Sequence, residues 1–182
     1  MRRILTPLLQ LFPSLTQGET WDNLVVRDDI IYEKSTGVPF TGKVKGTYQG
    51  EVKNGKKDGP WVIYRKNGRV ASKVIYKDGK TDGPLVYYWE NGNVMNEERF
   101  EDGKRNGPWI FYHENGKFKS EVIWKDDKKV GLSVSYHKNG KLQYKGTYKD
   151  DEMDGPWVHY NKNGTVDEKY TGTYKNGVRI SD

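Results

Sequence analysis

"DGPWVIYRKNG", residues 58–68, decides the fold of this 182-residue chain, because the chain repeats it. The first half recurs at a constant step of 24 residues, as "DGPWVIY" at Asp58, "DGPLVYY" at Asp82, "NGPWIFY" at Asn106, "VGLSVSY" at Val130 and "DGPWVHY" at Asp154. The second half keeps the same step, as Asn67-Gly68, Asn91-Gly92, Asn115-Gly116, Asn139-Gly140 and Asn163-Gly164. A fixed period of this size indicates an array of repeated structural units.

Each unit has the pattern of a β-hairpin. Asn-Gly favours a type I′ turn because both residues tolerate positive φ, and the flanking runs are short, aromatic and β-branched. We place a further turn at each Asp-Gly-Pro segment, and another at Asp78-Gly79, Asp102-Gly103, Asp126-Asp127 and Asp150-Asp151. Frequent Gly and Pro exclude helices. The sequence therefore predicts an all-β fold, an elongated antiparallel meander of stacked 24-residue hairpins in a single twisted sheet.

The period also divides the chain. Residues 58–177 hold five repeats, with starts at 58, 82, 106, 130 and 154, and residues 178–182 form a C-terminal tail. Residues 19–57 follow the period loosely, and we assign them to an N-terminal capping hairpin and a partial repeat.

Alternation along a strand assigns side chains to two faces. One face is uniform and is interpreted as the packed side: Val62/Tyr64, Val86/Tyr88, Ile110/Tyr112, Val134/Tyr136 and Val158/Tyr160. The other face varies: Trp61/Ile63, Leu85/Tyr87, Trp109/Phe111, Ser133/Ser135 and Trp157/His159. Positions that vary are less bound to the packing of the repeat, so we expect partner contact there. The alternative is that these aromatic side chains only cover a thin sheet.

Composition separates the chain from several protein classes. Aromatic residues make up 13%, with 13 Tyr and 6 Trp, which argues against disorder. The formal net charge is +6, but basic and acidic residues are interleaved, as in "YKDGKTDG", so a solvated surface of mixed charge is favoured over a nucleic-acid site. The chain has no Cys, which excludes disulfides and a cysteine nucleophile.

The N-terminal segment "MRRILTPLLQLFPSLTQG", residues 1–18, differs from the rest. Two Arg, an apolar stretch and small polar residues follow one another in the order of a secretory signal peptide. Its removal near Gly18 predicts a secreted or periplasmic protein, whereas a retained cytosolic tail predicts a cytoplasmic one.

The unit, with "DGPWxxYxxNG" followed by "YKDGK", resembles the MORN-variant repeat of bacterial proteins often labelled antitoxin-like. "LVVRDDIIYEKSTGVPFTGKV", residues 24–44, is similar to the leader hairpin of many such proteins, and the resemblance covers residues 24–180. It implies stacked hairpins that act as scaffolds, with protein or membrane-lipid contacts. It also implies a signal peptide in many members and, from the antitoxin label, a cytosolic toxin partner. The fourth copy departs from the pattern, because Leu132 and Ser133 replace Pro and Trp.

The chain contains no catalytic signature. GxSxG, the P-loop, the dinucleotide fingerprint after a strand and HExxH are all missing, so we expect no enzyme, cofactor or metal ion. His113 and His137 lie one period apart, about 9.6 Å between backbones in a meander, which is too far for a shared ion. His159 is expected to be an ordinary surface residue.

Three binding hypotheses follow, and none involves specific nucleic acid. In the first, an aromatic face docks an unidentified protein, with a toxin as the partner that the resemblance implies. Its residues are Trp61, Tyr87, Trp89, Trp109, Phe111 and Trp157. In the second, basic residues at equivalent turns bind an anionic membrane or polymer: Lys56, Lys57, Lys80, Lys104, Arg105, Lys128 and Lys129. In the third, open sheet edges pair to form homo-oligomers.

Overall fold

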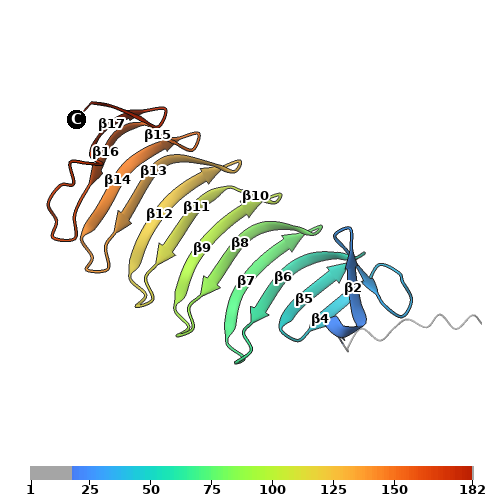
Figure 1. The fold of residues 1–182 in the computed structure, drawn as a ribbon. Coiled ribbons are helices and arrows are strands. Elements are labelled where there is room, and N and C mark those ends of the chain that lie inside the picture. The colour runs from blue at the N-terminus through green and yellow to red at the C-terminus, as the bar shows by residue number, and fades with distance from the viewer. Residues whose placement is uncertain (1–17, 182) are drawn as a thin grey trace, which may run out of the picture.

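The computed structural model describes residues 18–181, which form a long ribbon of curved strands (Figure 1). The predicted signal peptide, residues 1–18, lies outside the described residues except for Gly18. One short 3-10 helix, η1 (Trp21–Asn23), precedes the hairpins. The strands are β1 (Glu19–Thr20), β2 (Leu24–Arg27), β3 (Ile30–Glu33), β4 (Gly42–Lys45), β5 (Tyr48–Lys53), β6 (Lys56–Tyr64), β7 (Val70–Lys77), β8 (Lys80–Tyr88), β9 (Val94–Glu101), β10 (Lys104–Arg105), β11 (Gly107–Tyr112), β12 (Phe118–Lys125), β13 (Lys128–Tyr136), β14 (Leu142–Lys149), β15 (Glu152–Met153), β16 (Gly155–His159), β17 (Gly172–Lys175) and β18 (Val178–Ser181).

The strands follow one another through the sheet in chain order, which confirms the predicted meander of hairpins. The main sheet has 16 strands, and every neighbouring pair from β4 to β18 is antiparallel. Three details differ from the prediction. β1 pairs with β4 in parallel, and β2 and β3 form a separate two-stranded sheet, so the fold is not one purely antiparallel sheet. Val178–Ser181, predicted to be a tail, form the last strand.

Two kinds of turn close the hairpins at opposite edges of the sheet, which we call the turn edge and the loop edge. At the turn edge, Asp78 and Gly79 have φ of 51° and 87°, which fits type I′. At the loop edge the predicted type I′ turn is wrong, because in Asn67-Gly68 only the glycine has positive φ. Asn67 instead accepts a hydrogen bond from the backbone N–H of Arg69 through Oδ1, at 3.1 Å. Its side-chain acceptor therefore explains its place in the loop.

The Asp-Gly-Pro segments are not turns, in contrast to the prediction. Gly83 lies inside the continuous strand β8 with φ of 121°, and the register of β7 against β8 shifts between Val74 and Tyr76. Extra residues in one strand, with a glycine at positive φ, make a β-bulge that bends the strand. Equivalent glycines with positive φ are Gly59, Gly107, Gly131 and Gly155. Each strand pair is therefore bent across its middle, which gives the curved strands of Figure 1.

The core lies on the face that varies between repeats, so the sequence-based assignment of the faces is wrong. We call this face, with Trp61 and Ile63 and their equivalents, the inner face. Trp61 and Trp157 are only 1% and 2% exposed, and buried polar side chains lie on the same face: Ser72, Asn96, Ser133 and Ser135. On the outer face, half-buried residues such as Val62 and Val86 flank exposed Lys73. The bend brings inner side chains from both halves of each strand together.

At Trp61, Leu85 and Trp157, side-chain size on the inner face matches the residue in the preceding strand. Trp61 packs on Gly50, where an added Cβ would lie 2.2 Å from the indole ring. One repeat later, Leu85 stands beside the larger Val74, so a smaller side chain fills the space. We call this line of cross-strand neighbours the tryptophan row: Gly50, Trp61, Val74, Leu85, Glu98, Trp109, Val122, Ser133, Gly146, Trp157 and Gly172.

The hairpin β2–β3 covers the first strands of the array. Leu24 and Ile31 are buried in one cluster with Val44, Val52 and Trp61. The backbone N–H of Ile31 donates to the carbonyl of Gly55 at 2.8 Å, which fixes the hairpin on the β5–β6 turn. This end of the ribbon therefore has a packed apolar cover.

Candidate functional site

A line of cross-strand neighbours runs along the inner face and alternates larger side chains, several of them aromatic, with small polar ones. We call this line the loop-side row: Tyr48, Ile63, Ser72, Tyr87, Asn96, Phe111, Ser120, Ser135, Tyr144 and His159. Tyr87 and Phe111 flank the short Asn96, so two rings project on either side of a small residue. Both rings are half-buried and keep an accessible part. This arrangement suits apolar side chains that insert between rings.

Glu98 places a carboxylate among these rings. It occupies the tryptophan row, where the aligned return-strand residues are Val74, Val122 and Gly146. Burial raises the pKa of the Glu98 carboxyl, while the hydrogen bond from Asn96 at 2.5 Å and the Arg105 charge lower it. The sequence analysis missed Glu98. A charged residue at a repeat position that holds small or apolar residues in the other repeats would have identified it.

Cations lie over aromatic rings on the turn side of the inner face. Arg105 Cζ is 3.9 Å from the ring centre of Trp124 and 5.8 Å from that of Trp109. Lys57 Nζ lies 5.0 Å from the ring centre of Trp61 and 4.9 Å from that of Tyr76, and burial lowers the pKa of its ammonium. These contacts hold the cations against the sheet instead of presenting them to a membrane.

The structure separates the six predicted aromatic residues into two sets. Trp61 and Trp157 are core residues, because their Nε1 atoms donate to the carbonyls of Glu51 at 3.1 Å and Thr147 at 3.0 Å. A partner cannot contact these side chains without opening the sheet. The other four are half-buried and keep accessible surface, so their role in binding stays a prediction: Tyr87, Trp89, Trp109 and Phe111.

Trp89 lies apart from the central rings, at the loop edge. Its equivalents reach a backbone carbonyl of the next repeat: His113 Nε2 lies 3.3 Å from Tyr136 O, and His137 Nε2 lies 2.9 Å from Tyr160 O. These histidines therefore join successive repeats. Within residues 18–181, no group of three metal-ligating side chains comes together.

The predicted basic edge is partly neutralised by contacts between repeats. Ion pairs join Lys80 to Asp102 at 2.9 Å, Arg105 to Asp127 at 2.9 Å and Lys128 to Asp150 at 3.4 Å. Lys57 and Lys129 lie over aromatic rings, whereas Lys56 and Lys104 are exposed. The turn edge is thus a ladder of alternating charges more than a cationic surface.

None of the helices in the described part of the chain is long and apolar enough to cross a membrane.

Comparison with protein families places the repeats. Residues 81–102, 105–126 and 129–150 match the MORN repeat variant, and residues 48–60 match the MORN repeat. No curated protein matches the chain. MORN repeats are generally non-enzymatic modules that mediate protein or membrane-lipid interactions. The matched segments include Tyr87, Glu98 and Trp109, the centre of the inner face.

Proposed function

Because the chain is a MORN-variant repeat protein, we propose that it is a non-catalytic scaffold that binds a protein segment along the centre of its inner face. The observation that supports this most strongly is the position of Glu98, Tyr87 and Trp109 together on a half-exposed stretch between the closed Trp61 and Trp157 sites. The core residues at either side fix the sheet, while the central rings keep accessible surface.

The chemistry of this stretch selects a class of segment. Aromatic faces and a carboxylate together attract a cation, so a Lys or Arg flanked by apolar residues is the best match. Burial also raises the pKa of the Tyr87 hydroxyl, with the Glu98 charge adding to the effect, so Tyr87 stays a neutral donor. A toxin is the partner that the antitoxin label of the resembling repeat proteins implies, and this finer assignment is part of the proposal.

Serine substitutions at the loop-side row test the scaffold. Tyr87→Ser and Phe111→Ser copy Ser135, which the fourth repeat carries at the same position, so the fold accepts the change. We expect the pair to weaken binding of a purified partner at least tenfold, because one aromatic hot spot contributes about 2 kcal/mol or more. Lys73→Ser, on the outer face, is the matched control and should bind normally. If the double variant keeps every partner that the wild type captures from the native source, the inner face is not the interface.

The anionic-surface hypothesis has a separate test. The ion pairs of the turn edge reduce its field, so we expect no flotation with phosphatidylserine vesicles at physiological salt. Salt-sensitive flotation that Lys56→Ala and Lys104→Ala abolish would favour the membrane over the protein partner. Light scattering at high concentration distinguishes edge-to-edge oligomers from a monomer.

The site of action is also a proposal. Secretion follows from the signal-like order of residues 1–18, and N-terminal sequencing of the protein from its native source tests it. A start near Gly18 supports export, whereas an intact Met1 supports the cytoplasmic alternative that a toxin partner suggests.

A further inference from the structure

The last hairpin of the array contains two extra residues. In the fourth repeat, "LQYKGTYK" runs from Leu142 to Lys149, whereas the last unit reads "VDEKYTGTYK" from Val166 to Lys175. The added length leaves the ladder: residues 168–170 form a turn, and the next strand, β17, begins only at Gly172. The return strand is therefore displaced from the loop-side row in this unit.

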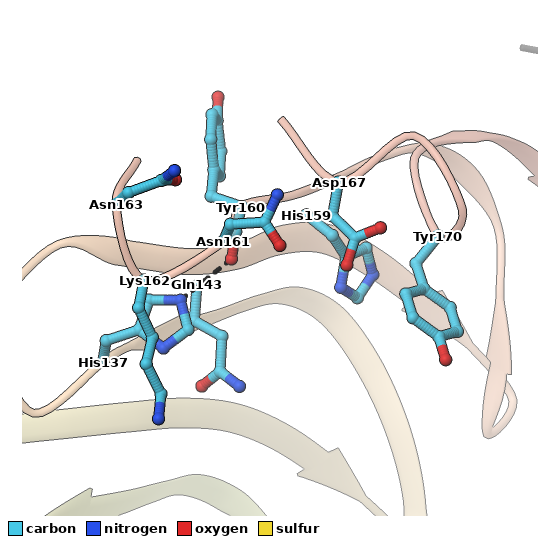
Figure 2. Close-up of a pocket in the computed structure, with 9 residues that line it drawn as sticks. All are labelled: His137, Gln143, His159, Tyr160, Asn161, Lys162, Asn163, Asp167 and Tyr170. Atoms are coloured by element: carbon cyan, nitrogen blue, oxygen red, sulfur yellow. Dashed lines mark hydrogen bonds between the residues drawn. The ribbon is translucent and has the colours of Figure 1, made fainter. Parts of the chain in front are cut away.

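The displaced segment borders a pocket at the loop edge of the inner face. Its volume is about 710 Å³, within the range of small-molecule sites. Figure 2 shows the side chains around it, with His137, Gln143 and Lys162 on one side and His159, Asp167 and Tyr170 on the other. A smaller hollow of about 360 Å³ lies one repeat earlier, where Lys119, Tyr136 and Gln143 stand 24 residues before Gln143, Tyr160 and Asp167. The regular repeat therefore already has a hollow here, and the last unit, with its insertion, has a larger one that Tyr170 also lines.

His159 forms an aromatic wall of the pocket and is not the ordinary surface residue that the sequence suggested. Its ring stacks on Trp157, with 6.0 Å between centroids, and lies 5.8 Å from the ring of Tyr170. Its Nε2 is buried and has no hydrogen-bond partner among the described residues. A buried polar atom beside a pocket needs a partner, and a bound ligand can supply one.

The other polar groups are held in place but keep hydrogen-bonding capacity. Gln143 Oε1 accepts from Ser135 Oγ at 3.1 Å, which leaves its Nε2 as a donor. Asp167 Oδ1 accepts from the backbone N–H of Lys169 at 3.2 Å, which leaves Oδ2 as an acceptor. The pocket thus has oriented donors and acceptors on opposite walls.

The charge balance narrows the ligand class. The pocket is lined by one permanent cation, Lys162, and one carboxylate, Asp167. It therefore lacks the pair of converging cations that would favour an anionic phosphate ligand. Apolar walls do not dominate either, because amide groups from Gln143, Asn161 and Asn163 contribute. A sugar combines hydroxyls that donate and accept with C–H faces that pack on aromatic rings. We propose that this pocket binds a neutral saccharide, with its ring against Tyr170 and its hydroxyls on Gln143 and Asp167.

A glycan array probed with the full chain, followed by calorimetry with the strongest glycan, tests the proposal. We expect neutral glycans to bind, and Asp167→Asn and Gln143→Ala each to weaken binding roughly ten- to hundredfold through lost hydrogen bonds. A second variant replaces residues 166–171 with the Leu-Gln-Tyr-Lys of positions 142–145, which restores the regular repeat. It should fold, as shown by circular dichroism, and lose glycan binding.

The scaffold proposal and the saccharide proposal can be refuted independently of each other. Phe111→Ser, at the centre of the inner face, should leave glycan binding unchanged. The proposal is overturned if no neutral glycan binds, if only anionic glycans bind in a salt-sensitive manner, or if the regularised variant binds as well as the wild type.

Discussion

Substitution of Gly146 by Ala tests the matching of neighbours in the tryptophan row. Gly146 does not have positive φ, so Ala suits its backbone and would stabilise the chain by about 0.5–1 kcal/mol through lower unfolded-state entropy. However, the new Cβ would lie 2.0 Å from Cδ2 of Trp157, which is 2% exposed and has no free space to move into.

The clash outweighs the backbone gain. Overpacking of a filled core costs about 1–3 kcal/mol, and displacement of the indole breaks the Nε1 bond to the Thr147 carbonyl, which contributes about 1 kcal/mol. We therefore expect a net loss of about 1–3 kcal/mol in the free energy of unfolding. Urea unfolding followed by circular dichroism measures the loss, with an unchanged m-value as the sign that the same structure unfolds.

A double-mutant cycle distinguishes the clash from general damage. Trp157→Leu copies Leu85, which stands beside Val74, so the pair Gly146→Ala with Trp157→Leu has a native precedent. The double variant should be more stable than the sum of the single losses by about 0.5–3 kcal/mol. If the two losses add, or if Gly146→Ala alone stabilises the protein, complementary packing does not explain the variation of the inner face.

Two predictions concern pH. The Arg105 hydrogen bonds and charge hold the pKa of Asp127 below its usual value, so this pair stabilises the fold above the unfolded pKa and loses its effect as pH falls through the folded pKa. Asp127→Asn should thus reduce the fall of the urea midpoint between neutral pH and about pH 3, and an equal fall in both proteins would contradict this. Burial lowers the pKa of His159, although the nearby Asp167 charge acts in the opposite direction. As pH falls below about 6.5, His159 is therefore protonated more readily in the unfolded chain than in the folded one, which destabilises the fold. NMR titration should show the pKa of His159 below the ordinary value, and lower again in Asp167→Asn; a rise in that variant would contradict the assignment.

Sequence reasoning located the hairpins because the signals are local. Asp78-Gly79 and the 24-residue period depend only on neighbouring residues and on self-comparison. The faces could not be assigned in the same way, because alternation defines two faces without saying which is buried. Burial depends on the bend at Gly59 and its equivalents. Before the hydrogen-bond register is known, the Asp-Gly-Pro sequence at this bend is equally compatible with a turn.

The candidate site was only partly predictable for a related reason. Tyr87, Trp109 and Phe111 stood out as aromatic residues, but the sequence did not show why Trp109 keeps accessible surface while its equivalent Trp61 is buried. Trp61 packs on Gly50, whereas the residue aligned with Gly50 in the strand before Trp109 is Glu98. Gly50 lies 11 positions before Trp61 in the chain, in a different strand, so only the register reveals the contact. The pocket at His159 is larger than the hollow one repeat earlier, and two inserted residues border it. A comparison of repeats shows the insertion as a length difference but cannot place it in space.

The direction of the strands has a mechanical consequence. Each strand runs across the ribbon, and successive repeats are joined by ladder hydrogen bonds and by turn contacts such as Gly103 N to Thr81 O at 2.8 Å. Tension applied along the ribbon therefore loads these bonds one row at a time, as in the opening of a zipper, and not all together in shear. Because each repeat contacts its neighbours, the array should lengthen under load in hairpin-sized steps and re-form from the part that remains folded.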